Sequence, residues 1–460
     1  RLQFEAATRE AILAPTVLIG AASIDITPEY PIRLSGYGNR TKESEGIAQR
    51  IHAKALVIGG ASRHLSPSSR AKAGHVFIHA SHVAPEMSII LTVDNCGVSA
   101  SVTNRVFTTL QKRWGIQRER FVLCSSHTHS APWLPDFAPL LFADVPDEHR
   151  ATMARYEEEL VLKLTQVIHT AIRQRQVGQL ARGQGRVTFA RNRRKVESGK
   201  WVGFGSSPDG PVDHRLPIIL AYNRSGQPIA VLANYACHCT TVTGSSNDIS
   251  GDWATFAGNF IEEEYPNAVA LISIGAGADA DPHPRGTLDM ARQHGRALAD
   301  EVKRLIANPQ TRFDPARNAL MPGTLKPIDP RLVCRLEHID LPHGPIPTKE
   351  QFEEQAAAGG VQAAHARRFL AMLERGEQIS TVVPNYPVAV WTFANDLALV
   401  FLGGEVVVDY SIRMARQFDG DRLWLSAYSN AMPCYIASKR GLREGGYEAD
   451  ELNEGGYSAE

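Results

Sequence analysis

Residues 121–133 read FVLCSSHTHSAPW, an apolar run that leads into two histidines spaced two positions apart. The run is strand-like as far as Ser125. If the strand continues, its side chains alternate between two faces, so His127 and His129 would point the same way. They could then share a metal ion, or one could bind metal while the other serves the chemistry. The surrounding Ser and Thr residues fit two structural histidines with local hydrogen bonds equally well.

A second histidine stands in a similar place further along the chain. His238 ends the apolar run in ANYACHCTTVTG (233–244), just before several hydroxyl residues. Its neighbours Cys237 and Cys239 would face away from it, so the pattern favours a single histidine ligand over a Cys-His-Cys cluster. Taken alone, the pattern is more typical of a buried histidine that is hydrogen-bonded to the backbone.

Three more stretches carry polar groups at or after strand ends. IGAGADADPHPRG (274–286) contains Asp279 and Asp281, which also fit a turn or a calcium-type loop. FLGGEVVVDY (401–410) contains Glu405, and a carboxylate there is costly to bury unless it is paired or bound to metal. SNAMPCYIASK (429–439) places Tyr435 in a loop. Together with the histidines, these residues predict a hydrolytic zinc site.

The composition excludes several classes of protein. Lys plus Arg equals Asp plus Glu, at 49 each, so no bulk charge favours nucleic acid or an anionic membrane as a partner. We expect no transmembrane segment: the most apolar stretch, 388–408, contains Asn395, Asp396 and Glu405 and reads as two buried strands joined at Asn395-Asp396. Six cysteines do not make a disulfide scaffold. The composition is ordinary for a soluble globular enzyme, and we expect its partner to be a small-molecule substrate.

Strand-like and helical segments alternate along the chain. This predicts an α/β fold of the mixed α+β kind, with central mixed and antiparallel sheets flanked by helices. A hairpin over 216–239, turning at 223–226, argues against a purely parallel sheet. Apolar residues at helical spacing predict helices over 102–114 and 151–176, with two more near 252–264 and 287–307.

The stretch from about 308 to 386 is Pro-rich and then strongly helical in its middle, which predicts an insertion or a lid. No convincing linker divides the chain. We therefore expect one large catalytic domain over residues 1–460.

The motifs resemble, in order, those of the neutral ceramidase family. GAASIDITPEYPIRLSGYGNRTKESEGIAQRIHAKALVI (20–58) is similar to that family's opening, and SSHTHSAPW is similar to its Ser-x-His-Thr-His-Ser-Gly-Pro signature. NYACHCTTVTG with ISGDWATFAGNFIE resembles its second histidine strand and the following helix. GGEVVVDYSIRMAR and SNAMPCYIASK resemble its segments that bear Glu and Tyr. Five motifs in one order are much more specific than any one of them.

The resemblance implies a neutral-ceramidase-like catalytic domain that binds zinc through His127, His238, Glu405 and Tyr435. His129 would then lie close to the zinc-bound water or the substrate. Bound zinc would bring the pKa of that water toward neutrality. The family also favours a soluble protein that is secreted or periplasmic.

The chain departs from the family's pattern in three places. The family has a Gly-Asp-x-Ser-Pro segment with a catalytic serine, whereas this chain has Ala278–Pro282, with Asp281 in the serine's position. The family's Gly-Pro-Gly-Gly after the histidines is replaced by Ala131–Leu134, so Trp133 is expected to narrow or redirect the substrate wall. The chain also stops soon after Tyr435, so we expect no C-terminal immunoglobulin-like domain in it.

Three functions remain open from the sequence. The first is a zinc hydrolase that cleaves an amide (N-acyl) or related acyl bond, with Asp281 or His129 carrying protons and a substrate other than ceramide. The second is a zinc-dependent glycoside hydrolase, with Asp279 and Asp281 as acid and base, and with Arg191 and Arg193 binding a polar sugar. The third is a zinc-containing binding protein without catalysis.

Overall fold

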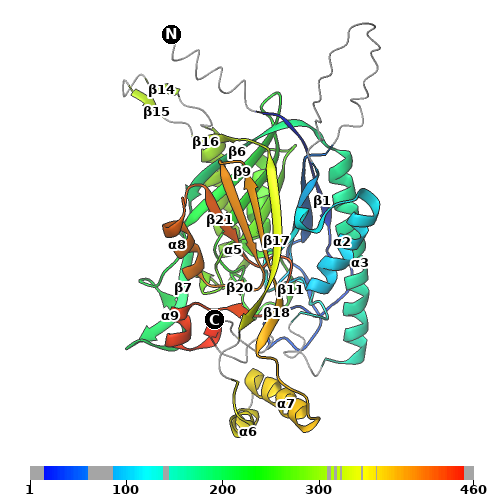
Figure 1. Ribbon diagram of the computed structural model, residues 1–460, viewed down its shortest axis with the longest axis vertical. Helices are drawn as coiled ribbons and strands as arrows, with labels where there is room; N and C mark the ends of the chain where they lie inside the picture. The colour runs from blue at the N-terminus through cyan, green and yellow to red at the C-terminus, as the bar shows by residue number, and fades with distance from the viewer. Residues whose placement is uncertain are drawn as a thin grey trace, which may run out of the picture.

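A curved nine-stranded sheet forms the centre of the fold. The computed structural model (Figure 1) describes residues 15–60, 86–137, 145–307, 312–314, 319–321, 324–342, 346–358 and 360–449. In this part of the chain the sheet has the order β12-β10-β9-β6-β1-β3-β4-β5, with β16 paired to β6. Its strands are β1 (Val17–Asp25), β3 (His52–Ile58), β4 (Ser88–Val93), β5 (Phe121–Ser125), β6 (Gln176–Arg186), β9 (Arg215–Asn223), β10 (Pro228–Tyr235), β12 (Val269–Ile274) and β16 (Leu325–Ile328).

The sheet is mixed, as the hairpin in the sequence predicted. The pairs β4–β5 and β10–β12 are parallel, whereas β1–β3, β3–β4, β6–β9 and β9–β10 are antiparallel. The predicted hairpin is β9–β10, and it turns at Gly226 with a φ of 78°. A positive φ of this size suits glycine, which has no Cβ to clash.

A second sheet of four strands packs on the first. It contains β17 (Leu332–Pro342), β18 (Val382–Phe393), β19 (Leu397–Leu402) and β21 (Leu423–Ser426), in that order. The two buried strands expected on either side of Asn395-Asp396 are therefore β18 and β19. Trp391 and Phe401 meet edge to face in the core that the two sheets share, with ring centroids 5.6 Å apart.

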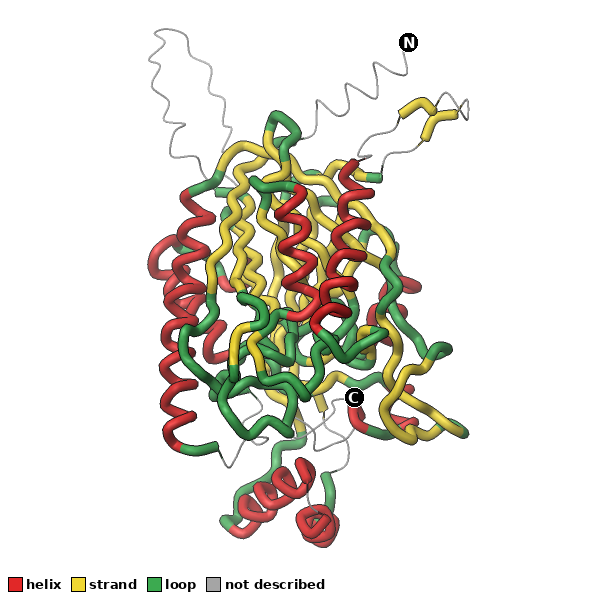
Figure 2. The backbone as a smooth tube through the Cα atoms, turned by 180° about the vertical axis from the view of Figure 1, so that it is seen from behind, coloured by secondary structure: helices red, strands yellow, loops and turns green. Residues whose placement is uncertain are grey.

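Burial alternates along the strands of the large sheet. On β4, Ile89, Leu91 and Val93 face one core and Ile90 faces another. Helices cover the first of these faces, as Figure 2 shows from behind. They are α2 (Ala100–Trp114) and α3 (Asp147–Arg173) over one half, and α4 (Asp252–Glu264) and α5 (Leu288–Ala307) over the other. Because each fully buried aliphatic side chain contributes roughly 1.5–3 kcal/mol, this two-sided burial strongly favours one register.

One extended segment joins the two edge strands of the large sheet. Residues 427–430 follow β21; the N–H of Ala427 donates to the carbonyl of Ile274 on β12 at 2.9 Å. The N–H of Ser125 on β5 donates to the carbonyl of Tyr428 at 3.0 Å. The sheet therefore curves until its two edges lie on either side of this segment.

Small sheets connect the strand ends. They pair β13 (Ala280–Pro282) with β7 (Ala190–Glu197) and β8 (Lys200–Ser207), β20 (Glu405–Val406) with β22 (Tyr435–Ile436), β2 (Gly46–Ile47) with β11 (Asp248–Ile249), and β14 (Arg312–Asp314) with β15 (Ala319–Met321). The remaining helices nearby are α8 (Val408–Gln417), α9 (Lys439–Glu444), η1 (Arg118–Arg120) and η3 (Tyr447–Ala449).

The predicted helical insertion corresponds to two helices between β17 and β18. These are α6 (Lys349–Ala358) and α7 (Gly360–Glu374), which pack on each other around Phe352 and Phe369. In Figure 1 they lie beyond the ends of β17 and β18, on the same side as α9. The strands β16 and β17, which also fall within 308–386, belong to the two large sheets. No helix within the described residues is both long and apolar enough to cross a membrane.

Candidate metal centre

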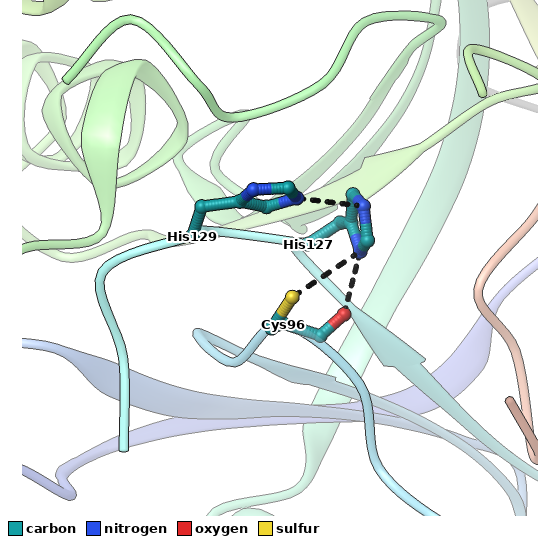
Figure 3. A group of neighbouring side chains, drawn as sticks. All are labelled: Cys96, His127 and His129. Carbon is teal, nitrogen blue, oxygen red and sulfur yellow. Dashed lines mark hydrogen bonds between the residues drawn. The ribbon is translucent and has the colours of Figure 1, made fainter. Parts of the chain in front are cut away.

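His127 leaves the edge strand through a backbone turn. The strand β5 ends at Ser125, and His127 has a φ of 55°, so the strand does not continue through the histidines. Its Nδ1 lies 2.6 Å from the carbonyl oxygen of Cys96 (Figure 3). A carbonyl oxygen can only accept, so in the neutral ring Nδ1 carries the proton and Nε2 presents a lone pair.

His238 is held in the same way. It follows β10, and its Nδ1 lies 2.9 Å from the carbonyl oxygen of Gly277. Its own backbone N–H donates to the carbonyl of Ala280, and its carbonyl accepts from the indole of Trp253. The ring and the backbone of His238 are thus both fixed, and the lone pair of Nε2 is free of the backbone and lies near Glu405.

Glu405 and Tyr435 are partners in a two-stranded parallel sheet. They lie directly opposite each other in the β20–β22 pairing, and the N–H of Glu405 donates to the carbonyl of Cys434. Both residues are buried, Glu405 completely. Because neighbouring residues at one register position share a face of a sheet, the pairing places the carboxylate and the phenol side by side.

Three of the predicted metal ligands converge on one point. Nε2 of His127 lies 3.1 Å, and Nε2 of His238 3.2 Å, from Oε2 of Glu405. These three side chains form a group that could hold a metal ion. Two lone pairs and a carboxylate at this separation repel one another unless a cation or a proton lies among them. Two imidazoles and a carboxylate are also a ligand set found in catalytic zinc sites.

The ligand atoms of a second group, Cys96 with His127 and His129, also lie close enough together to share a metal ion. The thiol Sγ of Cys96 lies 3.8 Å from Nδ1 of His127, on the ring edge that already donates to the Cys96 carbonyl. This group offers no carboxylate. The group that contains Glu405 therefore fits a divalent cation better.

His129 lies beside this group. Its Nε2 is 3.1 Å from Nε2 of His127, and its ring meets the ring of Tyr37 edge-on at 5.0 Å. Gly36 permits this approach, because a Cβ at Gly36 would lie 2.4 Å from the His129 ring and because its φ is 93°. The two histidines therefore converge as the sequence predicted, although a turn brings them together and strand alternation does not.

The pKa values of the three histidines differ with their surroundings. Burial lowers the pKa of His129, and the two neighbouring imidazoles lower it further. Burial and the Arg193 guanidinium lower the pKa of His238. Burial also acts to lower the pKa of His127. The negative charge of Glu405 and the neighbouring Cys96 act in the opposite direction, and together they hold the pKa of His127 well above 6.5. A metal ion would take the place of that proton.

Arg193, from β7, reaches into the group. Its NH1 lies 3.3 Å from Nε2 of His238 and 3.5 Å from Oδ1 of Asp281, and its NH2 donates to the hydroxyl of Tyr435 at 3.1 Å. Asp281 also pairs with Arg285 and accepts from Thr240. Burial would raise the pKa of Asp281, but the two guanidinium groups hold it below its usual value.

The other predicted site residues lie apart from the convergence point. Asp279 is fully buried, accepts from Asn192 and from the N–H of Val408, and has a pKa that burial raises to about 6. Arg191 donates to the nearby carbonyls of Thr188 and Ala190. Trp133 is 2% exposed, packs in the core under α2 and α3, and donates to the carbonyl of Phe137.

Arg285 and Glu448 are among the participants that were not anticipated from the sequence. Arg285 pairs with Asp281 and donates to the hydroxyl of Tyr37, and Glu448 accepts from Nε of Arg193. Arg285 stands in the quoted ADADPHPRG stretch, four residues after Asp281, which is the one signal that could have found it. Glu448 lies in a Gly- and Glu-rich C-terminal stretch whose composition gives no such signal.

A family model described as neutral/alkaline non-lysosomal ceramidase, N-terminal, matches residues 17–276, which is more than half of the chain. The chain belongs to the neutral/alkaline ceramidase family. The fold of this ceramidase-family chain is similar to the crystal structure of neutral ceramidase from Pseudomonas aeruginosa, with a TM-score of 0.65 and 18% identity over 97% of this chain and 72% of that one. A ceramidase complexed with C2 gives a TM-score of 0.66 with the same identity and coverage. No curated protein sequence matches closely enough to count as a relative.

Membership confirms the expected family and its mixed α/β fold, and supports an amide hydrolase. The family match ends at residue 276, so it includes His127 and His238. Asp281, Glu405 and Tyr435 lie beyond it. In this ceramidase-family chain the grouping of those later residues rests on the geometry alone.

Proposed function

We propose that this chain is a zinc-dependent hydrolase that uses water to cleave an amide (N-acyl) or related acyl bond. The observation that carries the proposal is the meeting of the His127 and His238 Nε2 atoms at one oxygen of Glu405, at 3.1 and 3.2 Å. Backbone carbonyls fix both rings from behind, as is usual for metal-binding histidines. Tyr435, beside Glu405, is the proposed fourth ligand.

Zinc bound there would supply Lewis-acid polarisation of the scissile carbonyl and would acidify water. The surrounding side chains orient and stabilise the reacting groups. Arg193 is fully charged and buried, so its NH1 and NH2 can donate to negative charge that develops on the carbonyl oxygen. His129, whose Nε2 stands 3.1 Å from that of His127, is placed to accept a proton from the attacking water.

The substrate we propose is an N-acyl compound other than ceramide. Asp281, in the position where the family has its serine, pairs with both Arg193 and Arg285. The ion pairs of Asp281 with Arg193 and Arg285 therefore occupy the position in which a serine hydroxyl would otherwise contact the substrate. This change favours a substrate with a more polar or charged group next to the amide. Trp133 does not support this proposal, because its indole lies in the hydrophobic core.

One observation favours the glycoside hydrolase alternative, the raised pKa of Asp279, but the contacts of the two aspartates oppose it. A general acid must hold a proton that it can release toward the leaving group. Asp281 is kept ionised by two guanidinium groups, and Asp279 is occupied by Asn192 and the N–H of Val408.

An activity screen tests the proposal directly. Purified protein loaded with zinc is given N-acyl lipids including ceramide, N-acyl amino acids and aryl glycosides, each with and without a chelator. We expect chelator-sensitive release of a carboxylic acid from an N-acyl compound, with ceramide a poorer substrate. Release of sugar alone, or turnover that a chelator leaves unchanged after complete zinc removal, would show the proposal to be wrong.

A further inference from the structure

Glu448 bridges two neighbouring arginines at the border of the metal centre. It lies in η3, and its side chain is only 1% exposed. Oε1 accepts from Nε of Arg193 at 2.7 Å, and Oε2 accepts from NH1 of Arg194 at 2.5 Å. A carboxylate at this depth needs cationic partners, and the two guanidinium groups supply them.

The bond at Nε determines which way the Arg193 guanidinium faces. The group is planar and rigid, so fixing Nε also fixes the directions of NH1 and NH2. Those two nitrogens meet His238, Asp281 and Tyr435 on the opposite side. Glu448 thus holds the far edge of Arg193, while the near edge faces the site of reaction.

Aromatic rings enclose the same guanidinium. Its carbon lies 5.3 Å from the ring centroid of Phe204, 5.9 Å from that of Tyr435 and 5.7 Å from that of Tyr447. These rings restrict movement of the side chain but provide no acceptor at Nε. The directional contact at that nitrogen is the one with Glu448.

The backbone just before Glu448 packs closely against the ring of Trp201. Gly446, two residues earlier, has a φ of 92°, and a Cβ there would lie 2.3 Å from the ring of Trp201. Upstream, Arg440 pairs with Asp409 of α8 and with Glu444. The segment from Ser438 to Ala449 therefore has its own anchors besides Glu448.

We propose that Glu448 is a positioning residue for Arg193, and that it aims the guanidinium at the substrate carbonyl. The proposal rests on the proposed function for the role of Arg193 in turnover. It assigns Glu448 alone of the segment Ser438–Ala449 to the reaction centre, although Glu448 is not among the proposed metal ligands.

The test compares Glu448→Gln with Glu444→Gln. The Glu448→Gln amide would keep the shape of the side chain but only one acceptor oxygen, so its NH₂ would face one of the two guanidinium groups. Glu444→Gln removes a carboxylate, 14% exposed, that anchors the same segment through Arg440 and Arg194 but does not contact Arg193. With a fluorogenic N-dodecanoyl arylamide, we expect Glu448→Gln to lower kcat about 10- to 100-fold while KM changes little. Glu444→Gln should keep kcat close to wild type.

A crystal structure of zinc-loaded Glu448→Gln provides a readout that does not depend on turnover. We expect the Arg193 guanidinium to rotate away from Tyr435 and Asp281, with His127, His238 and Glu405 unmoved. If Glu448→Gln does not fold, Glu448→Asp serves instead, because it keeps the charge but withdraws the carboxylate by one methylene.

Two results would overturn the positioning role. One is an unmoved Arg193 in the variant crystal structure. The other is an equal loss of kcat in Glu448→Gln and Glu444→Gln, which would mean that both residues only anchor the segment. If the wild type cleaves no N-acyl compound, the proposed function fails, and the crystal structures still decide whether Glu448 positions Arg193.

Discussion

The carbonyl oxygens of Cys96 and Gly277 decide which nitrogen each imidazole presents to Glu405. Each accepts from an Nδ1, so each histidine already directs Nε2 at Glu405 before any metal arrives. Preorganisation of this kind lowers the cost in conformational entropy of binding a metal ion. At the scale of single residues, the centre therefore depends on two backbone groups that no side-chain motif reveals.

Substitutions of Glu405 and Cys96 distinguish the two candidate metal groups. Glu405→Gln removes the negative charge shared by His127 and His238, so we expect zinc affinity to fall by more than about 100-fold. Cys96→Ala leaves the backbone carbonyl in place and should keep roughly one zinc per chain. Metal analysis after dialysis measures both. Zinc lost from Cys96→Ala and retained by Glu405→Gln would assign the metal to Cys96, His127 and His129 instead.

Gly36 and Gly38 form a matched pair for the position of His129. A Cβ at Gly36 would collide with the His129 ring and would occupy a positive φ, whereas a Cβ at Gly38 meets nothing within 4 Å. Gly36→Ala should therefore destabilise the fold by roughly 1–2 kcal/mol from backbone strain and lower kcat by about 100-fold through displacement of His129. Gly38→Ala should do neither. Thermal unfolding and steady-state kinetics check both variants, and an active Gly36→Ala would argue against a catalytic His129.

At the scale of elements, the helical pair α6 and α7 stands apart from the large cores. Its small core contains Phe352, Phe369 and their neighbours, all from residues 346–379. The strands that lead to it end with Pro342 opposite Val382. A short turn can therefore join β17 directly to β18, because the two strand ends are already adjacent.

Replacing residues 343–381 by Asn-Gly tests the predicted lid. We expect the fold and zinc content to be retained, with a change in Tm of no more than about 4 °C. We also expect kcat/KM for a long-chain N-acyl substrate to fall roughly tenfold, because a lid shields bound substrate from water. An N-acetyl substrate is the control, since a short chain needs less cover. Identical kinetics with the long-chain substrate would exclude a lid.

At the scale of the whole molecule, helix α8 is joined to the large sheet through Asp213. Its carboxylate pairs with Arg215 of β9 at 2.6 Å and accepts from Ser411 of α8 at 2.5 Å. Burial would raise the pKa of Asp213, but the hydrogen bonds and charge of Arg215, with Ser411, hold it below 3.8. A depressed pKa stabilises the fold above the unfolded value, and this contribution is lost as the pH falls through the folded value.

Asp213→Asn should therefore lower Tm at pH 7, and the difference from wild type should shrink below about pH 4 as the wild-type carboxylate is protonated. Thermal unfolding between pH 7 and pH 3 measures this. Asp419→Asn is the control, because that carboxylate is half exposed and its pair with Arg422 is screened by water. A constant difference across the pH range would contradict the assignment.

The sequence predicted the elements better than it predicted how the candidate site residues meet. Strand and helix patterns are local, so the hairpin β9–β10 and the long helix α3 were recognisable from periodicity. The pairing of Asp281 with Arg285 and of Arg193 with Glu448 depends on tertiary placement, which periodicity does not encode. Trp133 shows the same limit: its neighbours in sequence indicated a substrate wall, and the fold places its indole in the core.

The segment 427–430 lies between the two sheet edges and is made late during synthesis of the chain, so the large sheet can be completed only late. Tyr435 and Glu448 come after it, and about 300 residues separate His127 from Tyr435, so a ribosome working at roughly 5–20 residues per second needs roughly 15–60 s to make that stretch. Until residues 427–430 have emerged, the two edges of the large sheet cannot be joined, and the proposed metal ligand Tyr435 follows later still. If Tyr435 binds the metal and Glu448 positions Arg193 as proposed, the polypeptide gains activity only after both residues have been made.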